Sequence, residues 1–196
     1  MIGIPLGLLY ANANEWVIHK YLLHKRGRDK KSFWSFHWHD HHKTVRQLDH
    51  EDPMYRNKLF ASWDPQTKEV AALLAGAVVH APLLPVAPFF VGAVWFSAFN
   101  YYRVHKKSHL DIEWAKEHLP WHWDHHMGPN QDANWCVTHP FFDWVMGTRK
   151  KYLNTPEEIA ARPQREAFTA KKRAEWEAKH AAPTTADEDH AWAKAA

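Results

Sequence analysis

The stretch Trp121-His122-Trp123-Asp124-His125-His126-Met127 decides how the rest of the chain is interpreted. Its three histidines stand at positions i, i+3 and i+4, so a helix projects all three imidazoles from one face. Neutral imidazole is the most frequent side-chain ligand of transition metals in proteins. The stretch therefore predicts a helix that carries metal ligands.

Three further groups of histidines come before this one in the chain. They are His19 and His24, then His37, His39, His41 and His42, and then His105 and His109. Together the four groups hold more imidazoles than one ion can bind, because a metal ion takes four to six ligands. We therefore predict a polyhistidine site for two metal ions, built from four segments.

The spacings within these groups leave two questions open. His19 and His24 are five residues apart, roughly 140° around an ideal helix. This pair fits one site only if the helix is locally distorted, or if the two rings flank different metals. In the second group, the i, i+4 pair of His37 and His41 competes with the i, i+3 pair of His39 and His42, so either His37 or His39 is the expected ligand.

The composition excludes several other classes of protein. A chain of 196 residues is long enough for one domain with a sizeable core. Its single cysteine, Cys136, excludes an intrachain disulfide framework, thiolate zinc sites and cysteine-ligated iron–sulfur clusters. The net charge of +3 comes without a long basic stripe, so we expect no nucleic-acid partner.

Two apolar stretches favour a membrane protein. Residues 2–23 are about long enough to cross a bilayer, although an amphipathic soluble helix is the alternative. Residues 70–102 contain no Asp, Glu, Lys or Arg, and prolines interrupt them near the middle, which predicts a membrane hairpin or one kinked span rather than a buried soluble helix. Basic residues flank this stretch on both sides and place both flanks in the cytoplasm. The predicted fold is all-α: an integral membrane helical bundle with a cytoplasmic, His-rich helical cap.

The C-terminal part of the chain differs in composition. We predict a membrane metal-binding domain over residues 1–152 and a charged tail over residues 153–196. Within the tail, Thr155 and Pro156 are typical of a helix start. Residues 164–180 are predicted to be helical, and residues 181–196 to be disordered.

Other catalytic patterns do not explain the histidines. Soluble di-iron bundles use paired Glu-x-x-His motifs, and this chain has one, Glu177 to His180, in the tail. The zincin pattern His-Glu-x-x-His and the nucleophile pattern Gly-x-Ser-x-Gly are both absent.

The order of the histidine boxes resembles the fatty acid hydroxylase/sterol desaturase superfamily over residues 14–148. The matching boxes are His-x4-His at 19 and 24, His-His at 41 and 42, His-x3-His at 105 and 109, and His-x2-His-His at 122, 125 and 126. The segment Asn134-Trp-Cys-Val-Thr-His-Pro-Phe-Phe-Asp-Trp-Val-Met-Gly-Thr148 is similar to the ending of that family. Residues 15–24 are also similar to the first box of bacterial carotenoid hydroxylases. The chain departs from the family at Trp38, where the second box has its first histidine.

The resemblance implies a membrane-embedded, non-haem di-iron lipid hydroxylase that uses O2 as co-substrate and receives electrons from a ferredoxin- or cytochrome-type reductase. The expected substrate is a fatty acyl chain or another membrane lipid, with carotenoids and sterols as alternatives. The site is expected at the cytoplasmic membrane face, and zinc can replace iron in purified material. Four acidic residues are expected to orient ligand imidazoles: Glu15, Asp40, Asp124 and Asp143.

Three alternatives remain at the sequence level. A desaturase uses the same oxidant without transferring oxygen to the substrate. A non-catalytic metal-binding membrane protein would use the same histidines for storage or sensing. A soluble zinc hydrolase would need no hydrophobic hairpin.

Overall fold

The computed structural model describes residues 2–180, and every regular element within them is helical. The all-α prediction is therefore confirmed for this part of the chain. The predicted disorder of residues 181–196 lies outside the described residues.

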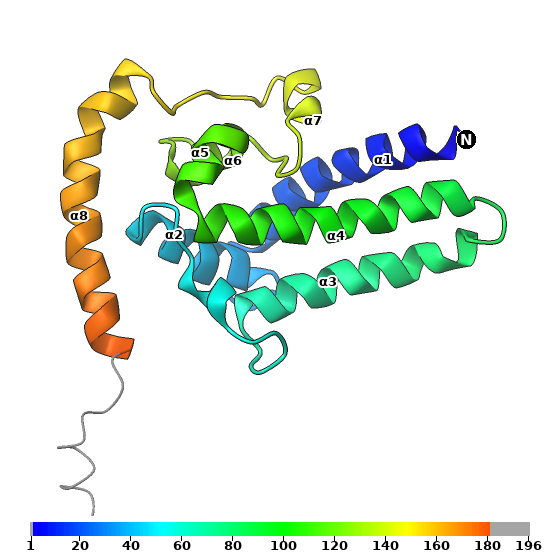
Figure 1. Ribbon diagram of the computed structural model, residues 1–196, viewed down its shortest axis with the longest axis horizontal. Helices are drawn as coiled ribbons and strands as arrows, with labels where there is room; N and C mark the ends of the chain where they lie inside the picture. Colours follow the sequence, from blue (N-terminus) through cyan, green and yellow to red (C-terminus); the bar gives the residue numbers. More distant parts are fainter. Residues whose placement is uncertain (1, 181–196) are drawn as a thin grey trace, which may run out of the picture.

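Three long helices run side by side at one end of the molecule (Figure 1). Helix α1 (Gly3–Ile18) continues without a break into the π-helix η1 (His19–Arg26). Helices α3 (Pro65–His80) and α4 (Pro88–Leu110) form a hairpin around the short 3-10 turn η4 (Ala81–Leu83). Of the membrane hairpin and the single kinked span predicted over residues 70–102, the structure has two helices joined by a turn in the proline-containing segment, although neither could cross a membrane.

Local signals explain where the hairpin helices begin. The Asp64 side chain accepts a hydrogen bond from the Thr67 backbone N–H at 2.8 Å, and Pro65 occupies the first helical position. Pro88 plays the same part at the start of α4. The chain between these helices cannot continue α3, because proline lacks the required N–H.

Helix α1 packs closely against α4 because it carries a glycine at the contact. A Cβ atom at Gly7 would lie 2.7 Å from both the Ala93 Cβ and the Phe90 carbonyl oxygen. These distances are shorter than any van der Waals contact, so a larger residue cannot be accommodated without moving one helix.

Shorter helices cover the other end of the three-helix layer. They are η2 (His37–His42), α2 (Lys43–Gln47), η3 (Pro53–Arg56), α5 (Ile112–His118), α6 (Pro120–Met127) and α7 (Phe141–Val145). Two of the four histidine boxes lie on helices of this region, η2 and α6.

The last described helix, α8 (Pro156–His180), stands apart from the long-helix layer and contacts α2 (Figure 1). It begins at Pro156, directly after Thr155, as the sequence predicted. It also includes the whole of the helix predicted over residues 164–180. The buried Glu158 carboxylate accepts hydrogen bonds from Arg162 at 2.6 Å and Arg165 at 2.8 Å, and Arg165 also reaches Asp49 at 3.0 Å.

The predicted integral membrane bundle is wrong. None of the helices in residues 2–180 combines the length and the apolar character needed to cross a bilayer. The physical reason lies at the helix ends: α1 has 16 residues before the His-rich turn begins, and α3 carries Lys68 and Glu69 in its first turns. The apolar part of α4 likewise ends before Arg103 and His105.

Candidate metal centre

Two π-helical turns bring the first two histidine boxes into position. A π-helix forms i→i+5 hydrogen bonds, so residues five apart come onto one face. The Gly27 N–H donates to the Leu22 carbonyl at 3.0 Å in this pattern. The π-helix η1 therefore aligns His19 with His24, and η2 aligns His37 with His42. This is the local distortion that the spacing of His19 and His24 required.

Five buried imidazoles converge in the first cluster: His19, His24, His37, His42 and His125. The Nε2 atoms of His24, His42 and His125 lie 3.1–3.2 Å from one another. The Nε2 atom of His37 lies 3.0 Å from that of His19 and 3.2 Å from that of His42.

Four buried imidazoles form the second cluster: His41, His105, His109 and His126. The Nε2 atoms of His105 and His109 are 3.2 Å apart, and the Nε2 atom of His122 lies 3.1 Å from that of His109. His122 belongs with His50 and His109 to a further group whose ligand atoms also lie close together.

Backbone carbonyls fix the protonation of three of these rings. The Nδ1 atoms of His19 and His125 lie 2.6 Å from the carbonyl oxygens of Trp135 and Ala133, and His109 Nδ1 lies 2.8 Å from the His50 carbonyl. A carbonyl only accepts, so each Nδ1 carries the proton and donates it. In a neutral ring, Nε2 is then left with a lone pair directed into its cluster.

In the second cluster, two carboxylates accept the Nδ1 protons of histidine rings. His41 Nδ1 donates to Asp52 at 2.7 Å, and His105 Nδ1 donates to Glu69 at 2.5 Å. The Tyr55 hydroxyl also donates to Glu69, at 2.5 Å. Hydrogen bonds of this kind orient metal-binding imidazoles and increase their basicity.

Burial favours the neutral form of many of these rings. Desolvation, reinforced in each of them by neighbouring imidazoles, lowers the pKa of these rings well below the usual value: His19, His37, His42, His50, His109, His122 and His126. Burial lowers the pKa of His125 to about 4, although its hydrogen bond to Ala133 opposes the shift. Neutral imidazole is the form that binds metals.

The arrangement fits metal ions and is unfavourable without them. Lone pairs of His19 and His125 converge with other ring nitrogens, and the buried Nε2 atoms of His41 and His126 have no hydrogen-bond partner in the described residues. Ligands at right angles on an ion about 2.1 Å away lie about 3.0 Å apart, close to the observed 3.0–3.2 Å. The buried clusters can therefore hold metal ions.

The structure brings ten of the eleven histidines predicted from the sequence into or against these clusters, and it leaves out His39. His39 is half-buried, and its Nε2 atom lies 3.0 Å from the Arg28 carbonyl. Of the two alternatives left open by the second box, His37 is therefore the residue that lies in the centre.

None of the four acidic residues predicted to orient the rings forms a hydrogen bond with an imidazole. The Glu15 carboxylate accepts from the backbone N–H groups of Val137 and Thr138 at 3.0 and 2.9 Å, and burial raises its pKa to about 7. Asp143 accepts from the N–H groups of Trp135 and Cys136, both at 2.8 Å. These two residues hold the segment whose Trp135 carbonyl orients His19, so their effect on the ligands is indirect.

The other two acidic residues, Asp124 and Asp40, do not contribute to the orientation of the rings. Asp124 accepts from the Leu153 N–H at 2.6 Å and pairs with Arg149 at 2.8 Å, which ties α6 to the segment before α8. Asp40 is exposed, because the π-turn directs it away from the clusters.

Sequence reasoning missed three residues of the centre: His50, Asp52 and Glu69. His50 and Asp52 lie in a polar turn where no periodic pattern marks them. Glu69 could have been noticed in the sequence, because it is the last acidic residue before a long apolar stretch. The structure shows that it is buried. A lone acid at such a position is expected to have a partner.

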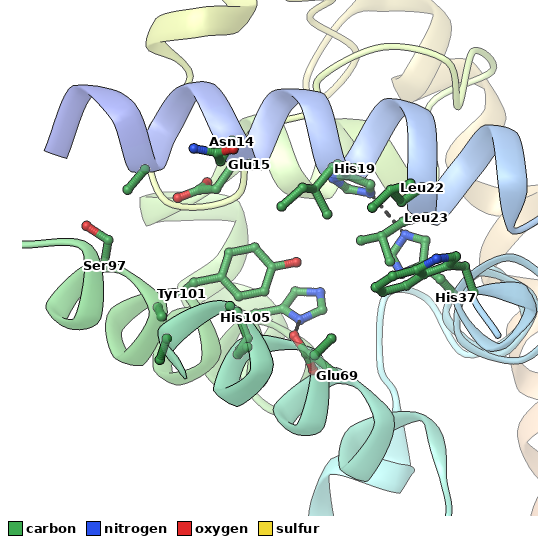
Figure 2. A pocket seen from close by; sticks show the side chains of 18 of the residues that line it. Asn14, Glu15, His19, Leu22, Leu23, His37, Glu69, Ser97, Tyr101 and His105 are labelled. Atoms are coloured by element: carbon green, nitrogen blue, oxygen red, sulfur yellow. Dashed lines mark hydrogen bonds and ion pairs between the residues drawn. The ribbon is translucent and has the colours of Figure 1, made fainter. Parts of the chain in front are cut away.

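An apolar cavity of about 220 Å³ opens onto both clusters (Figure 2). It lies between α1, α3 and α4, and imidazoles from each cluster line it: His19 and His37 from the first, and His41 and His105 from the second. Most of the remaining wall is apolar: Ala11, Ile18, Leu22, Leu23, Trp34, Phe36, Ala72, Leu73, Ala77, Val94 and Ala98.

Comparison with protein-family models, with curated proteins and with solved structures gave no match for this chain.

Proposed function

We propose that this chain is an O2-dependent, non-haem di-iron hydroxylase that acts on an unactivated C–H bond of a long apolar molecule. The observation that carries this proposal is the apolar cavity whose wall contains imidazoles of both clusters. A storage or sensing protein needs the clusters but has no use for such a cavity. The order of the histidine boxes, which resembles the fatty acid hydroxylase/sterol desaturase superfamily, supports the same reaction class.

The ligand set suits iron in this role. The first cluster would hold one iron through His19, His24, His37, His42 and His125, and the second cluster would hold the other through His41, His105, His109 and His126, with His122 beside it. When bound, the two irons supply O2 activation with electrons from a reductase partner. Imidazole is a neutral ligand, and the nine ligand rings come without a carboxylate ligand among them.

The chain itself positions the substrate. Tyr10 and His80 line the far end of the cavity, and the His80 Nε2 atom lies 3.0 Å from the Tyr10 hydroxyl. Along α3, the rise from Glu69 beside the clusters to His80 is about 16 Å. An extended chain with its polar end at Tyr10 and His80 would place a distant methylene at the imidazoles.

The cavity wall is also mostly apolar around the place proposed for the reacting carbon. Most side chains between the Tyr10–His80 pair and the rings are apolar, and Leu22 and Leu23 lie at the edge next to His19 and His37 (Figure 2). A C–H bond next to the rings would thereby lie in mostly apolar surroundings, which limits the water that can reach it.

Filling the cavity tests this proposal. Ala98→Phe places a ring in the cavity without changing any histidine, so we expect iron content to stay at the wild-type level. Reductase-dependent hydroxylation of long-chain alkyl substrates should fall at least tenfold, because the substrate no longer reaches the rings. Ala160→Phe, at an exposed position on α8, is the matched control and should keep full activity.

Product analysis by mass spectrometry decides the outcome. An alcohol that carries one oxygen atom from O2 supports the proposal. An alkene product would assign desaturation instead. Full metal loading with no oxygen uptake on any long-chain substrate would leave a metal-binding protein without this activity.

A further inference from the structure

His50 lies beside the second cluster and belongs to none of the histidine boxes. Its ring is fully buried, and its centroid lies 4.5 Å from that of His109 and 5.3 Å from that of His126. Neither ring nitrogen has a hydrogen-bond partner in the described residues. An unpaired buried polar group is costly, and here one side chain carries two of them.

The backbone at this position is strained. Asp49 has a φ of 52° and His50 a φ of 77°, which is the left-handed region that favours glycine. Two such non-glycine residues in succession cost free energy, and strain of this kind tends to occur where a fold holds a functional group in place. The strained turn directs the His50 ring to the cluster while its carbonyl accepts from His109 Nδ1 at 2.8 Å.

The position of His109 indicates which of the two metal ions His50 would bind. Its Nδ1 atom donates to the His50 carbonyl, so only Nε2 is free to bind a metal. His109 belongs both to the cluster with His41, His105 and His126 and to the group with His50 and His122. One lone pair binds one ion, so an ion that His109 holds lies where the two groups meet, within reach of a ring from either group.

From this geometry we infer that His50 is a ligand of the second metal, supplied by the strained turn outside the four histidine boxes. A bound metal ion would account for both features of this turn. It would give a His50 nitrogen a partner, and it would explain why the fold keeps the strained backbone at residues 49 and 50. His50 does not line the apolar cavity, so it would occupy a position on the second ion away from the substrate. This inference rests on the proposed two-metal centre.

The test is an anaerobic Co(II) titration of metal-free protein, in wild type and in His50→Asn and His50→Gly. Asparagine and glycine both tolerate a positive φ, so these variants keep the turn. We expect the first ion to bind as in wild type. The second ion should bind at least about tenfold more weakly, and the visible Co(II) spectrum of that site should change, because one nitrogen ligand is lost.

Stability supplies a second readout. In both variants the rise in Tm on loading the second ion should be smaller than in wild type, because that ion has lost a ligand. His39→Asn, at a histidine outside the centre, is the control and should titrate like wild type.

Two other outcomes separate the inference from the proposed function. If both His50 variants bind two ions with wild-type affinity and an unchanged spectrum, His50 is no ligand and the inference is overturned, while the two-metal centre stands. If wild type itself binds fewer than two ions, both fail. Two bound ions without hydroxylase activity would overturn the proposed reaction and leave the assignment of His50 supported.

Discussion

Neighbouring histidines in this chain belong to different clusters. On η2, His41 lies in the second cluster and His42 in the first, and on α6, His126 lies in the second and His125 in the first. Successive residues are about 100° apart on an α-helix such as α6, so neighbouring histidines can direct one ring to each cluster. The two pairs therefore fix the distance between the clusters through short, rigid helices.

At the same scale, buried carboxylates decide the orientation of the rings. Glu69→Gln keeps the size of the side chain but removes the charge that accepts the His105 Nδ1 proton at 2.5 Å and the Tyr55 hydroxyl at 2.5 Å. We expect the affinity of the second metal to fall about 10–100-fold, while the first metal binds normally. Titration with Fe(II) under argon measures both.

The control for this substitution is Asp40→Asn, which changes an exposed carboxylate close to the same boxes. It should leave both affinities unchanged. Equal losses in the two variants would mean that Glu69 acts through general charge and not through its contact with His105.

At the scale of single elements, the sequence predicted much of the helical structure. The i, i+4 spacing of His105 and His109 and the i, i+3, i+4 spacing in α6 correctly placed these rings on one helical face. The π-turns at η1 and η2 were not predictable in detail, because their i→i+5 hydrogen bonds need the tertiary contacts of the rings. For the same reason the choice between His37 and His39 had to come from the structure.

The packing of α1 on α4 makes a prediction about stability. Gly7→Ala forces a Cβ against the Ala93 side chain and the Phe90 carbonyl, so we expect the free energy of unfolding to fall by about 1–3 kcal/mol. Gly92→Ala is the matched control on α4, where no atom lies within 4 Å of the added carbon. It should raise the free energy of unfolding by about 0.4–1 kcal/mol. Urea unfolding measures both, and a neutral Gly7→Ala would contradict the observed close contact.

The docking of α8 depends on an ionised Glu158. Hydrogen bonds from Arg162 lower the pKa of this carboxyl to about 2, from an unfolded value near 4.5, with Arg165 adding to the shift. Because the folded pKa is the lower one, this stabilisation is complete above about pH 4.5 and is lost as the pH falls toward 2. Glu158→Gln should reduce the free energy of unfolding by about 1.5–3 kcal/mol at pH 7, and by much less at pH 2.

Thermal unfolding of metal-free protein at both pH values measures this effect. Glu175→Gln, which removes an exposed partner of Lys172, should leave stability unchanged at either pH. A loss in Glu158→Gln that is as large at pH 2 as at pH 7 would show that the side chain stabilises α8 by packing and not by its charge.

At the scale of the whole molecule, the fold joins ligands from segments far apart in the chain. His24 and His125, about a hundred residues apart, have Nε2 atoms 3.1 Å from each other. The sequence predicted that the boxes meet, because no single box completes a metal site. It did not predict the partners of the rings, since Asp52, Glu69 and the carbonyls of Ala133 and Trp135 are recognisable only after the chain has folded.

The membrane prediction failed at this scale for a related reason. Residues 70–102 form one apolar stretch in the sequence, but the fold divides them between α3 and α4. Each of these helices also contains charged residues outside the stretch: Lys68 and Glu69 in α3, and Arg103 in α4. A window of apolar residues in the sequence is therefore longer than the apolar part of either helix.

The proposed function requires that the chain hold two irons that react with O2. The most direct test measures iron content and reductase-dependent oxygen uptake together, on the same iron-loaded preparation, in wild type and in the double variant His125→Ala/His126→Ala, which removes one ring from each cluster. We expect about two irons per chain in wild type, with oxygen uptake stimulated by a long-chain alkyl substrate, and loss of both in the variant. A single tightly bound zinc in an iron-replete preparation, with no oxygen uptake, would contradict the account.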